Sequence, residues 1–122
     1  MDREHRVRRR EEFSRLRQRG RRLAHPLLRL QWVANALPVT RFGFVVGKRV
    51  AMRAHERNLV RRRLRELARA KLPGLAAGHD IVISAQPAAR LAGWAELAAA
   101  LEQLLRRAHL ERAVPPDGPA GP

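Results

Sequence analysis

Residues 57–72 constrain the fold of this chain more than any other segment, because two helical patterns coincide in them. At about 100° per residue, with Val60 at zero, the apolar side falls between about −20° and 80°. It consists of Val60, Leu64, Leu67 and Ala68, together with Lys71. The side between about 100° and 200° consists of Arg61, Arg65, Asn58, Arg69 and Arg62. The segment therefore predicts one helix, ended by Pro73-Gly74, with an apolar side for the core and an Arg-Asn side beside it.

Two segments before this helix alternate with a two-residue period instead. In residues 27–34, one side carries Leu28, Leu30 and Trp32 and the other carries Arg29 and Gln31. That alternation predicts a half-buried strand. Residues 42–46 predict a second strand, with a core face formed by Phe42, Phe44 and Val46. Since residues 35–38 between them are typical of a turn, we expect the two strands to form a hairpin.

The rest of the chain predicts a short helix, a further strand and a last helix. Phe13 and Leu16 share one face of a helix over residues 8–19, which Gly20 would end. Residues 80–85 are rich in β-branched side chains and predict a buried strand that joins the hairpin's sheet. A leucine stripe predicts a helix that opens near Gly93-Trp94 and reaches about residue 109.

These elements predict an α+β fold, a single small α/β sandwich formed by residues 1–112. It would have one sheet of about four strands and three helices packed mainly against one face, with the other face open to a ligand. Residues 113–122 contain too much Pro and Gly for a regular element, and we expect a disordered tail there.

The net positive charge of the chain comes from two stretches. The chain has 26 Lys and Arg against 11 Asp and Glu, a formal net charge of +15. Residues 1–22 account for +6, ten Arg minus four acids, and residues 41–71 for +9, eleven Lys and Arg minus two acids. Such a concentration indicates a surface that binds nucleic acid, and the alternative is a soluble protein whose surface is merely basic.

The Arg-Asn side of the helix over residues 57–72 suits RNA in particular. A guanidinium group donates two parallel hydrogen bonds to phosphate and keeps its charge at neutral pH. The Asn58 amide can donate and accept, and so can contact a 2′-hydroxyl, a base edge or metal-bound water. Glu66 is the sole acid in that segment, so the charge stays largely unneutralised. The alternative is a solvated helix face, although such faces usually intersperse Glu with Arg.

Two stretches of the sequence resemble the signature of the ribonuclease P protein family: Lys48-Arg49, and AHERNLVRRRLRE over residues 54–66. The family's core is Arg-Asn-Arg followed by an apolar residue and a basic run, and Arg57 and Asn58 match its first two positions. Leu59 departs from the third position, which is usually basic. At about 260° it lies beyond the Arg-Asn side, so we expect it to remove only a flanking contact. The likeness covers about residues 5–110.

The resemblance implies a fold similar to the second domain of a small-subunit ribosomal protein, a mixed sheet with a left-handed βαβ crossover. That hand is the opposite of the general rule. It also implies a function, in which one protein subunit helps one catalytic RNA remove the 5′ leader from precursor tRNA, with Mg²⁺ held mainly by the RNA. In the family the basic helix faces the catalytic RNA, and the residues carried over to that role are Lys48, Arg49, Arg53, Arg57, Asn58, Arg61, Arg62, Arg65 and Arg69.

The resemblance further implies a cleft for the single-stranded leader, between the sheet and the N-terminal helix. The residues that match it are Phe13, Arg17, Arg29 and Gln31. Because Arg17 and Gln31 stand where family members often carry aromatic residues, we expect leader binding to be more electrostatic here. Phe13 could equally be a core residue at helical spacing with Leu16, and we assign Phe42, Phe44 and Trp32 to the core.

No pattern in the sequence indicates catalysis or metal binding by protein side chains. The five His show no spacing typical of a metal site or of a base paired with a nucleophile, and we interpret His55 as a structural or phosphate-contacting residue. Cys is absent, which is compatible with a reducing cytosol, and no run of about 18 apolar residues occurs. We therefore expect a cytoplasmic protein without a membrane partner.

Two other classes of function fit a small basic chain. A structural ribosomal protein or general RNA chaperone would be equally small, basic and free of catalytic residues. A self-sufficient nuclease is disfavoured, because the acid clusters that would hold two metal ions are missing.

Overall fold

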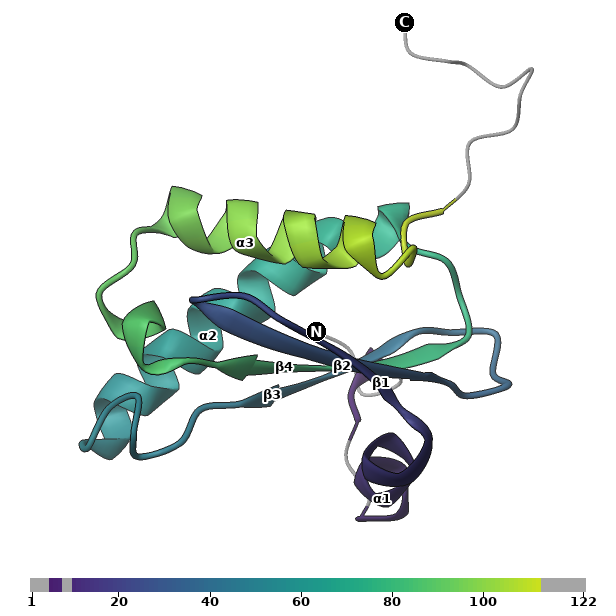
Figure 1. The fold of residues 1–122 in the computed structure, drawn as a ribbon, viewed down its shortest axis with the longest axis horizontal. Coiled ribbons are helices and arrows are strands. Elements are labelled where there is room, and N and C mark those ends of the chain that lie inside the picture. The colour runs from purple at the N-terminus through teal and green to yellow at the C-terminus, as the bar shows by residue number, and fades with distance from the viewer. Residues whose placement is uncertain (1–4, 8–9, 113–122) are drawn as a thin grey trace, which may run out of the picture.

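Three α-helices and four strands form a single layered unit in the computed structural model, which describes residues 5–7 and 10–112 (Figure 1). In chain order they are α1 (Arg10–Arg19), β1 (Arg21–Ala24), β2 (Leu28–Ala34), β3 (Arg41–Val45), α2 (Ala54–Lys71), β4 (His79–Ala85) and α3 (Trp94–Arg107), with short 3-10 helices η2 (Leu72–Gly74) and η3 (Pro87–Arg90). The expected tail, residues 113–122, lies outside the described residues, as does the expected helix start at residue 8. The predicted α+β class is confirmed.

The sheet has the strand order β1-β2-β4-β3, so the predicted hairpin between β2 and β3 is wrong. β4 lies between these two strands, antiparallel to β2 and parallel to β3. Its residues Ile81, Val82 and Ile83 are buried on both faces of the sheet. A continuous apolar run of this kind is typical of a central strand with a parallel neighbour. Burial of this run on both faces places β4 between β2 and β3, although only a short turn separates β2 from β3 in the sequence.

Strand β1 was not predicted as an element of its own, although the expected sheet of about four strands has room for one more than the three predicted segments. It pairs antiparallel with β2, from Arg21 opposite Trp32 to Ala24 opposite Arg29. Three of its four residues are exposed, so it carries little of the apolar alternation that identifies a strand. The sheet's true hairpin is therefore β1-β2.

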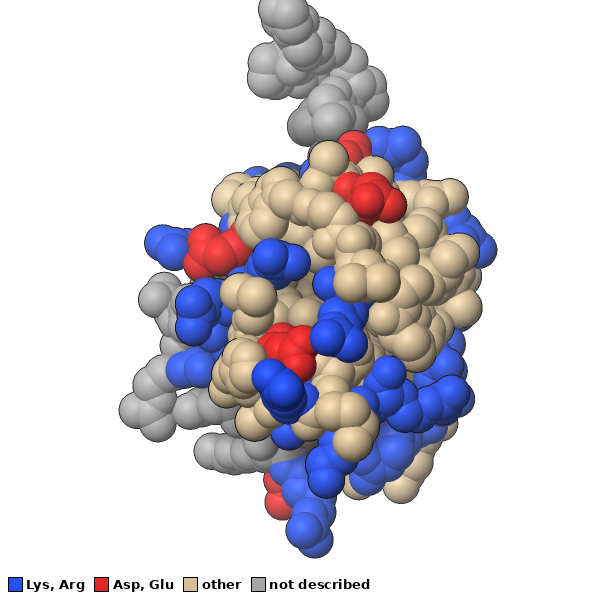
Figure 2. Space-filling view, turned by 90° about the vertical axis from the view of Figure 1, so that its left-hand side faces the viewer, with Lys and Arg blue, Asp and Glu red and all other residues tan. Residues whose placement is uncertain are grey.

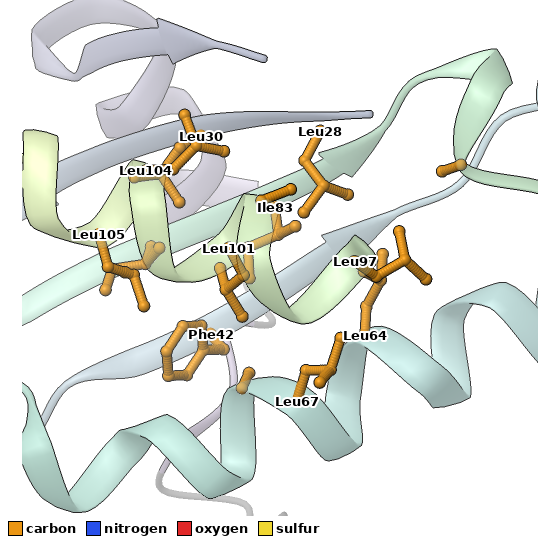
Figure 3. Close-up of a cluster of buried hydrophobic side chains, with 14 of the residues drawn as sticks. Leu28, Leu30, Phe42, Leu64, Leu67, Ile83, Leu97, Leu101, Leu104 and Leu105 are labelled. Carbon is orange, nitrogen blue, oxygen red and sulfur yellow. The ribbon is translucent and has the colours of Figure 1, made fainter. Parts of the chain in front are cut away.

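Helices α2 and α3 cover one face of the sheet, whereas α1 lies on the other (Figure 1). The main core lies under α2 and α3, where leucines of both helices meet the apolar side of the strands (Figure 3). The predicted apolar side of α2 is confirmed, since its buried residues are Val60, Leu64, Leu67 and Ala68. The helix itself begins three residues before the predicted start at Arg57.

Helix α1 packs on a smaller cluster. Leu16 is buried against Val7 and Val82, and Phe13 and Val33 are partly buried beside them. A Cβ atom at Gly43 would lie 3.3 Å from the Phe13 ring and from Val82, so a glycine lets α1 approach the sheet closely. The expectation of helices mainly against one face holds for α2 and α3, and α1 narrows the open part of the other face.

Candidate nucleic-acid interface

The Arg-Asn side of α2 faces away from the core. Asn58, Arg62 and Arg69 are exposed, and Arg61 and Arg65 are half-buried. Arg61 Nη1 donates a hydrogen bond of 2.7 Å to Asn58 Oδ1, which fixes the amide against the guanidinium group. Arg65 Nε is buried without a hydrogen-bond partner in the described part of the chain. These side chains form the α2 stripe, defined as Asn58, Arg61, Arg62, Arg65 and Arg69.

Arg57 differs from the α2 stripe because it turns back on the chain. Its Nη1 atom donates to the carbonyl oxygens of Ala51 (3.1 Å) and Met52 (2.7 Å). It thereby fixes the loop that precedes α2, in which Lys48 and Arg49 are exposed. The structure thus places Arg57 as a support for predicted RNA-binding residues, with part of its hydrogen-bonding capacity used internally.

Acidic side chains leave the α2 stripe unneutralised. Glu56 forms an ion pair with Arg90 of η3 at 2.7 Å, and Glu102 of α3 pairs with Lys71 and Arg106. Among the residues that the structure describes, no ion pair involves a member of the α2 stripe. Figure 2 shows Lys and Arg gathered over the lower part of the molecule, whereas in the upper part, at the height of α3, uncharged residues predominate and the blue and red residues are scattered among them.

A hollow of about 510 Å³ joins the two predicted sets of binding residues. It lies where the loop before α2 meets the end of β4, and Lys48, Arg49, Arg29, Ser84 and Gln86 line it. Lys48 and Arg49 belong to the predicted RNA-binding set, and Arg29 belongs to the predicted leader cleft. An RNA strand on the sheet face could therefore continue to the basic loop without leaving positive charge.

The four predicted leader-cleft residues lie on one side of the sheet, the side that carries α1. Arg29 is exposed and Gln31 is half-buried on β2, opposite Ser84 and Val82 of β4. Phe13 packs partly into the small cluster under α1, so it combines a core contact with an accessible edge. The exposed side chain of Arg17 donates a hydrogen bond of 3.1 Å to Ser14 within α1.

A buried polar network, which the sequence did not reveal, fixes α1 over this face. Asp80 is fully buried on β4 and accepts hydrogen bonds of 2.8 Å from Nε and Nη2 of Arg41 and from Nδ2 of Asn35. Arg41 also forms an ion pair with Glu12 of α1. The hydrogen bonds to Asp80 raise the pKa of Arg41 above its ordinary value, burial opposes this, and the charges of Asp80 and Glu12 add to it.

Comparison with known proteins identifies the family. The sequence matches the ribonuclease P family over residues 1–109. A ribonuclease P protein component of Chloroflexus aurantiacus is 41% identical over 111 residues, which cover 90% of this chain and 82% of the relative. One from Streptomyces bikiniensis is 42% identical over 113 residues, covering 85% and 91%. This chain belongs to the ribonuclease P protein family.

Solved structures of ribonuclease P proteins share the fold. The Staphylococcus aureus protein superposes with a TM-score of 0.80 at 22% identity, covering 88% of this chain and 98% of that one. The Thermotoga maritima protein in complex with 1-(4-fluorophenyl)-2-thiourea gives 0.76 at 25% identity, covering 84% and 98%. The resemblance seen in residues 48–66 is thus confirmed, and with it the role of protein subunit of the ribonuclease P enzyme, whose partner is an RNA subunit.

Proposed function

We propose that this ribonuclease P protein binds the RNA subunit through the α2 stripe and the loop before α2, and the 5′ leader of precursor tRNA through the sheet face beside α1. The observation that carries the proposal is the hollow beside the loop, because its lining joins Lys48 and Arg49 to Arg29. Both RNAs would then be bound by one continuous basic surface, with one protein per RNA subunit.

The α2 stripe supplies affinity by replacing counterions. Each phosphate that a guanidinium group neutralises releases condensed cations, which favours association and makes it sensitive to salt. The Asn58 amide nitrogen, held in place through Arg61, is positioned to donate to a 2′-hydroxyl or a base. Two anionic RNAs can approach each other on such a surface at a lower electrostatic cost.

Leader binding would combine one aromatic edge with charge. Phe13 offers part of its ring, and Arg29 and Arg17 are exposed on the same side of the sheet. Arginine can stack on a base and pair with phosphate, which suits a leader of variable sequence. The network of Glu12, Arg41 and Asp80 holds α1 where it forms one wall of this surface.

Hydrolysis is assigned to the RNA subunit and its Mg²⁺ ions. Within the described residues, no three His, Asp or Glu side chains are grouped so that they could hold a metal ion. The protein would raise affinity for substrate and metal by neutralising phosphates.

None of the helices in the described part of the chain has the length and apolar character that a membrane span requires. We place the complex in the cytoplasm.

Reconstitution tests the proposal directly. The purified protein is mixed with a bacterial ribonuclease P RNA and a precursor tRNA at low Mg²⁺, and 5′ cleavage is measured with and without protein. We expect strong stimulation that saturates at one protein per RNA. RNA binding without stimulation would favour a ribosomal protein or RNA chaperone, and cleavage by the protein alone would favour a nuclease.

A further inference from the structure

A second hollow lies at the end of the sheet opposite the loop before α2. Its volume is about 320 Å³, and its polar and aromatic lining consists of Arg19, Arg21, Trp32, His79 and His109. It forms where the C-terminal end of α3 lies over the end of the sheet at which β2 finishes and β4 begins (Figure 1). None of these five residues belongs to the predicted RNA-binding or leader-cleft sets.

His79 lines this hollow and has a buried ring nitrogen without a hydrogen-bond partner in the described part of the chain. Its Nδ1 atom is buried and has no partner among the described residues, although its backbone N–H donates to Thr40 Oγ1 at 3.2 Å. A buried polar atom without a partner costs free energy, and such atoms are rare in native proteins. His79 is therefore a lining residue of the hollow with an unmet hydrogen-bonding requirement.

His109 adopts a backbone conformation that a glycine would adopt more easily. Its φ of 58° lies in the left-handed region, directly after α3, where the Leu110 N–H donates to the Leu105 carbonyl oxygen at 3.1 Å. Helices that end in this way usually carry glycine at that position. A residue kept under strain in a hollow points to a function for its side chain. The His109 imidazole is exposed there.

The remaining lining groups suit a nucleotide. Trp32 is half-buried, with part of its indole packed on the main core, and Arg21 is its partner in the β1-β2 pairing. Arg19 and Arg21 are exposed, and neither forms an ion pair within the described ranges. Among the described residues, no carboxylate lines the hollow. Aromatic and imidazole rings beside two guanidinium groups are the elements that bind a base and its phosphate.

We propose that this hollow binds one nucleotide of a single-stranded RNA, with its base against Trp32 and His109 and its phosphate on Arg19 and Arg21. His79 would hydrogen-bond the base or ribose. The proposal rests on the proposed function, because it assigns the hollow to an RNA strand already held on the sheet face beside α1.

Strand β2 connects the two places. Arg29, Gln31 and Val33 follow one another on the α1 face of β2, where Val33 packs against the cluster under α1. Trp32 lies on the opposite face, and the hollow opens at the end of the strand, where both Trp32 and Val33 line it. Two residues of a strand span about 7 Å, so the hollow begins about 14 Å from Arg29.

Fluorescence of Trp32 provides the test. In a Trp94→Phe variant Trp32 is the only tryptophan, and Trp94, 52% exposed, lies at the far end of α3. Adding a single-stranded RNA oligonucleotide to the full chain should quench Trp32, whereas inorganic phosphate should not. A further His109→Gly change should weaken binding about tenfold. The same change should leave the Tm unchanged or raise it by up to about 4 °C, because glycine relieves the backbone strain.

Arg21→Ala and Arg107→Ala form a matched pair. Both remove one exposed positive charge, but Arg107 does not line the hollow. Arg21→Ala should weaken RNA binding about fivefold and lower the salt slope by about 0.7, and Arg107→Ala should change neither by as much. The proposal is overturned if RNA does not quench Trp32, if His109→Gly and Arg21→Ala bind like Arg107→Ala, or if AMP quenches as strongly as RNA. Loss of cleavage stimulation with quenching intact would contradict the proposed function alone.

Discussion

Helices α1 and α2 are both rich in arginine, but different forces attach them to the sheet. The 18 residues of α2 bury four apolar side chains in the main core, and its arginines stay free of acidic partners among the described residues. The 10 residues of α1 bury Leu16 and partly bury Phe13 on a small cluster, and the ion pair of Glu12 with Arg41 adds to that attachment.

On α2, the residues that stabilise the fold are different from those proposed to bind RNA, whereas on α1 the same residues serve both purposes. On α2, an arginine of the stripe can be replaced without changing the core contacts, because the residues that pack in the core lie on the other side of the helix. On α1, Phe13 and Glu12 hold the helix in place and also shape the surface beside it. Substitutions on α1 should therefore change stability and leader binding together, whereas those on the α2 stripe should change binding alone.

Asp80→Ala should have the largest effect on this comparison. It leaves Arg41 and Asn35 without their buried acceptor, and removing one partner of a buried pair typically costs about 3 to 5 kcal/mol. The free energy of unfolding, measured with urea at neutral pH, should fall by about that amount. Because the pKa of Arg41 is raised in the folded protein, its contribution to the free energy of unfolding is fully present at any pH below the ordinary arginine pKa. That contribution is lost only as the pH rises through the raised pKa.

Amide hydrogen exchange shows which helix loses stability in the Asp80→Ala variant. Amides of α1 should lose more protection than those of α2, because the network reaches α1 through Glu12 and does not reach α2. Glu12→Gln is the matched milder variant, which should loosen α1 with a smaller change in global stability. Equal loss of protection in both helices would show that the network supports the whole sheet and not α1 in particular.

Sequence periodicity predicted both α2 and α1 with their apolar sides, but it did not predict the polar contacts that attach α1 to the sheet. The spacing of Val60, Leu64 and Leu67 states which side of α2 is buried, because a helix repeats every 3.6 residues whatever surrounds it. The attachment of α1 depends on residues 12, 41 and 80, which only the folded sheet brings together. The position of β4 between β2 and β3 was missed for the same reason, since strand order depends on partners distant in the sequence.

The site showed the same division. The resemblance assigned Arg57 to RNA, but its hydrogen bonds to the Ala51 and Met52 carbonyls depend on a loop geometry that a motif does not specify. The hollow that contains His79 and His109 was not predicted either. Its one local signal was a histidine where a helix that ends at residue 107 would favour glycine, and that signal requires the helix end to be known.

Phe13→Ala should have the next largest effect. Removing a half-buried ring from the cluster with Leu16 should lower the free energy of unfolding by about 2 kcal/mol. If the ring edge also contacts the leader, cleavage assays should show a greater loss for a precursor with a long leader than for one with a very short leader. Equal losses on both substrates would assign Phe13 to the core alone.

Arg61→Ala and Arg65→Ala should weaken binding to the RNA subunit by about tenfold each. Each should lower the slope of log affinity against log salt by roughly one unit, because one phosphate contact is lost. The free energy of unfolding should change by less than about 0.5 kcal/mol, in contrast to the α1 variants. Arg107→Ala on α3 is the control for charge. An unchanged salt slope in either α2 variant would mean that the stripe faces solvent in the complex.

Leu59→Arg should have the smallest effect, and it acts in the opposite direction. Leu59 is 45% exposed beside the α2 stripe and stands where the family usually has a basic residue, so an arginine there adds charge without a cavity or a buried cation. Affinity for the RNA subunit should rise about threefold and the salt slope should steepen by up to one unit. A Leu59→Gln variant separates the added charge from the loss of an exposed leucine. If Leu59→Gln raised the affinity as much as Leu59→Arg, the gain would come from a polar contact with the RNA and not from the added charge. The basic side of α2 would then end at Arg62 and would not extend to position 59.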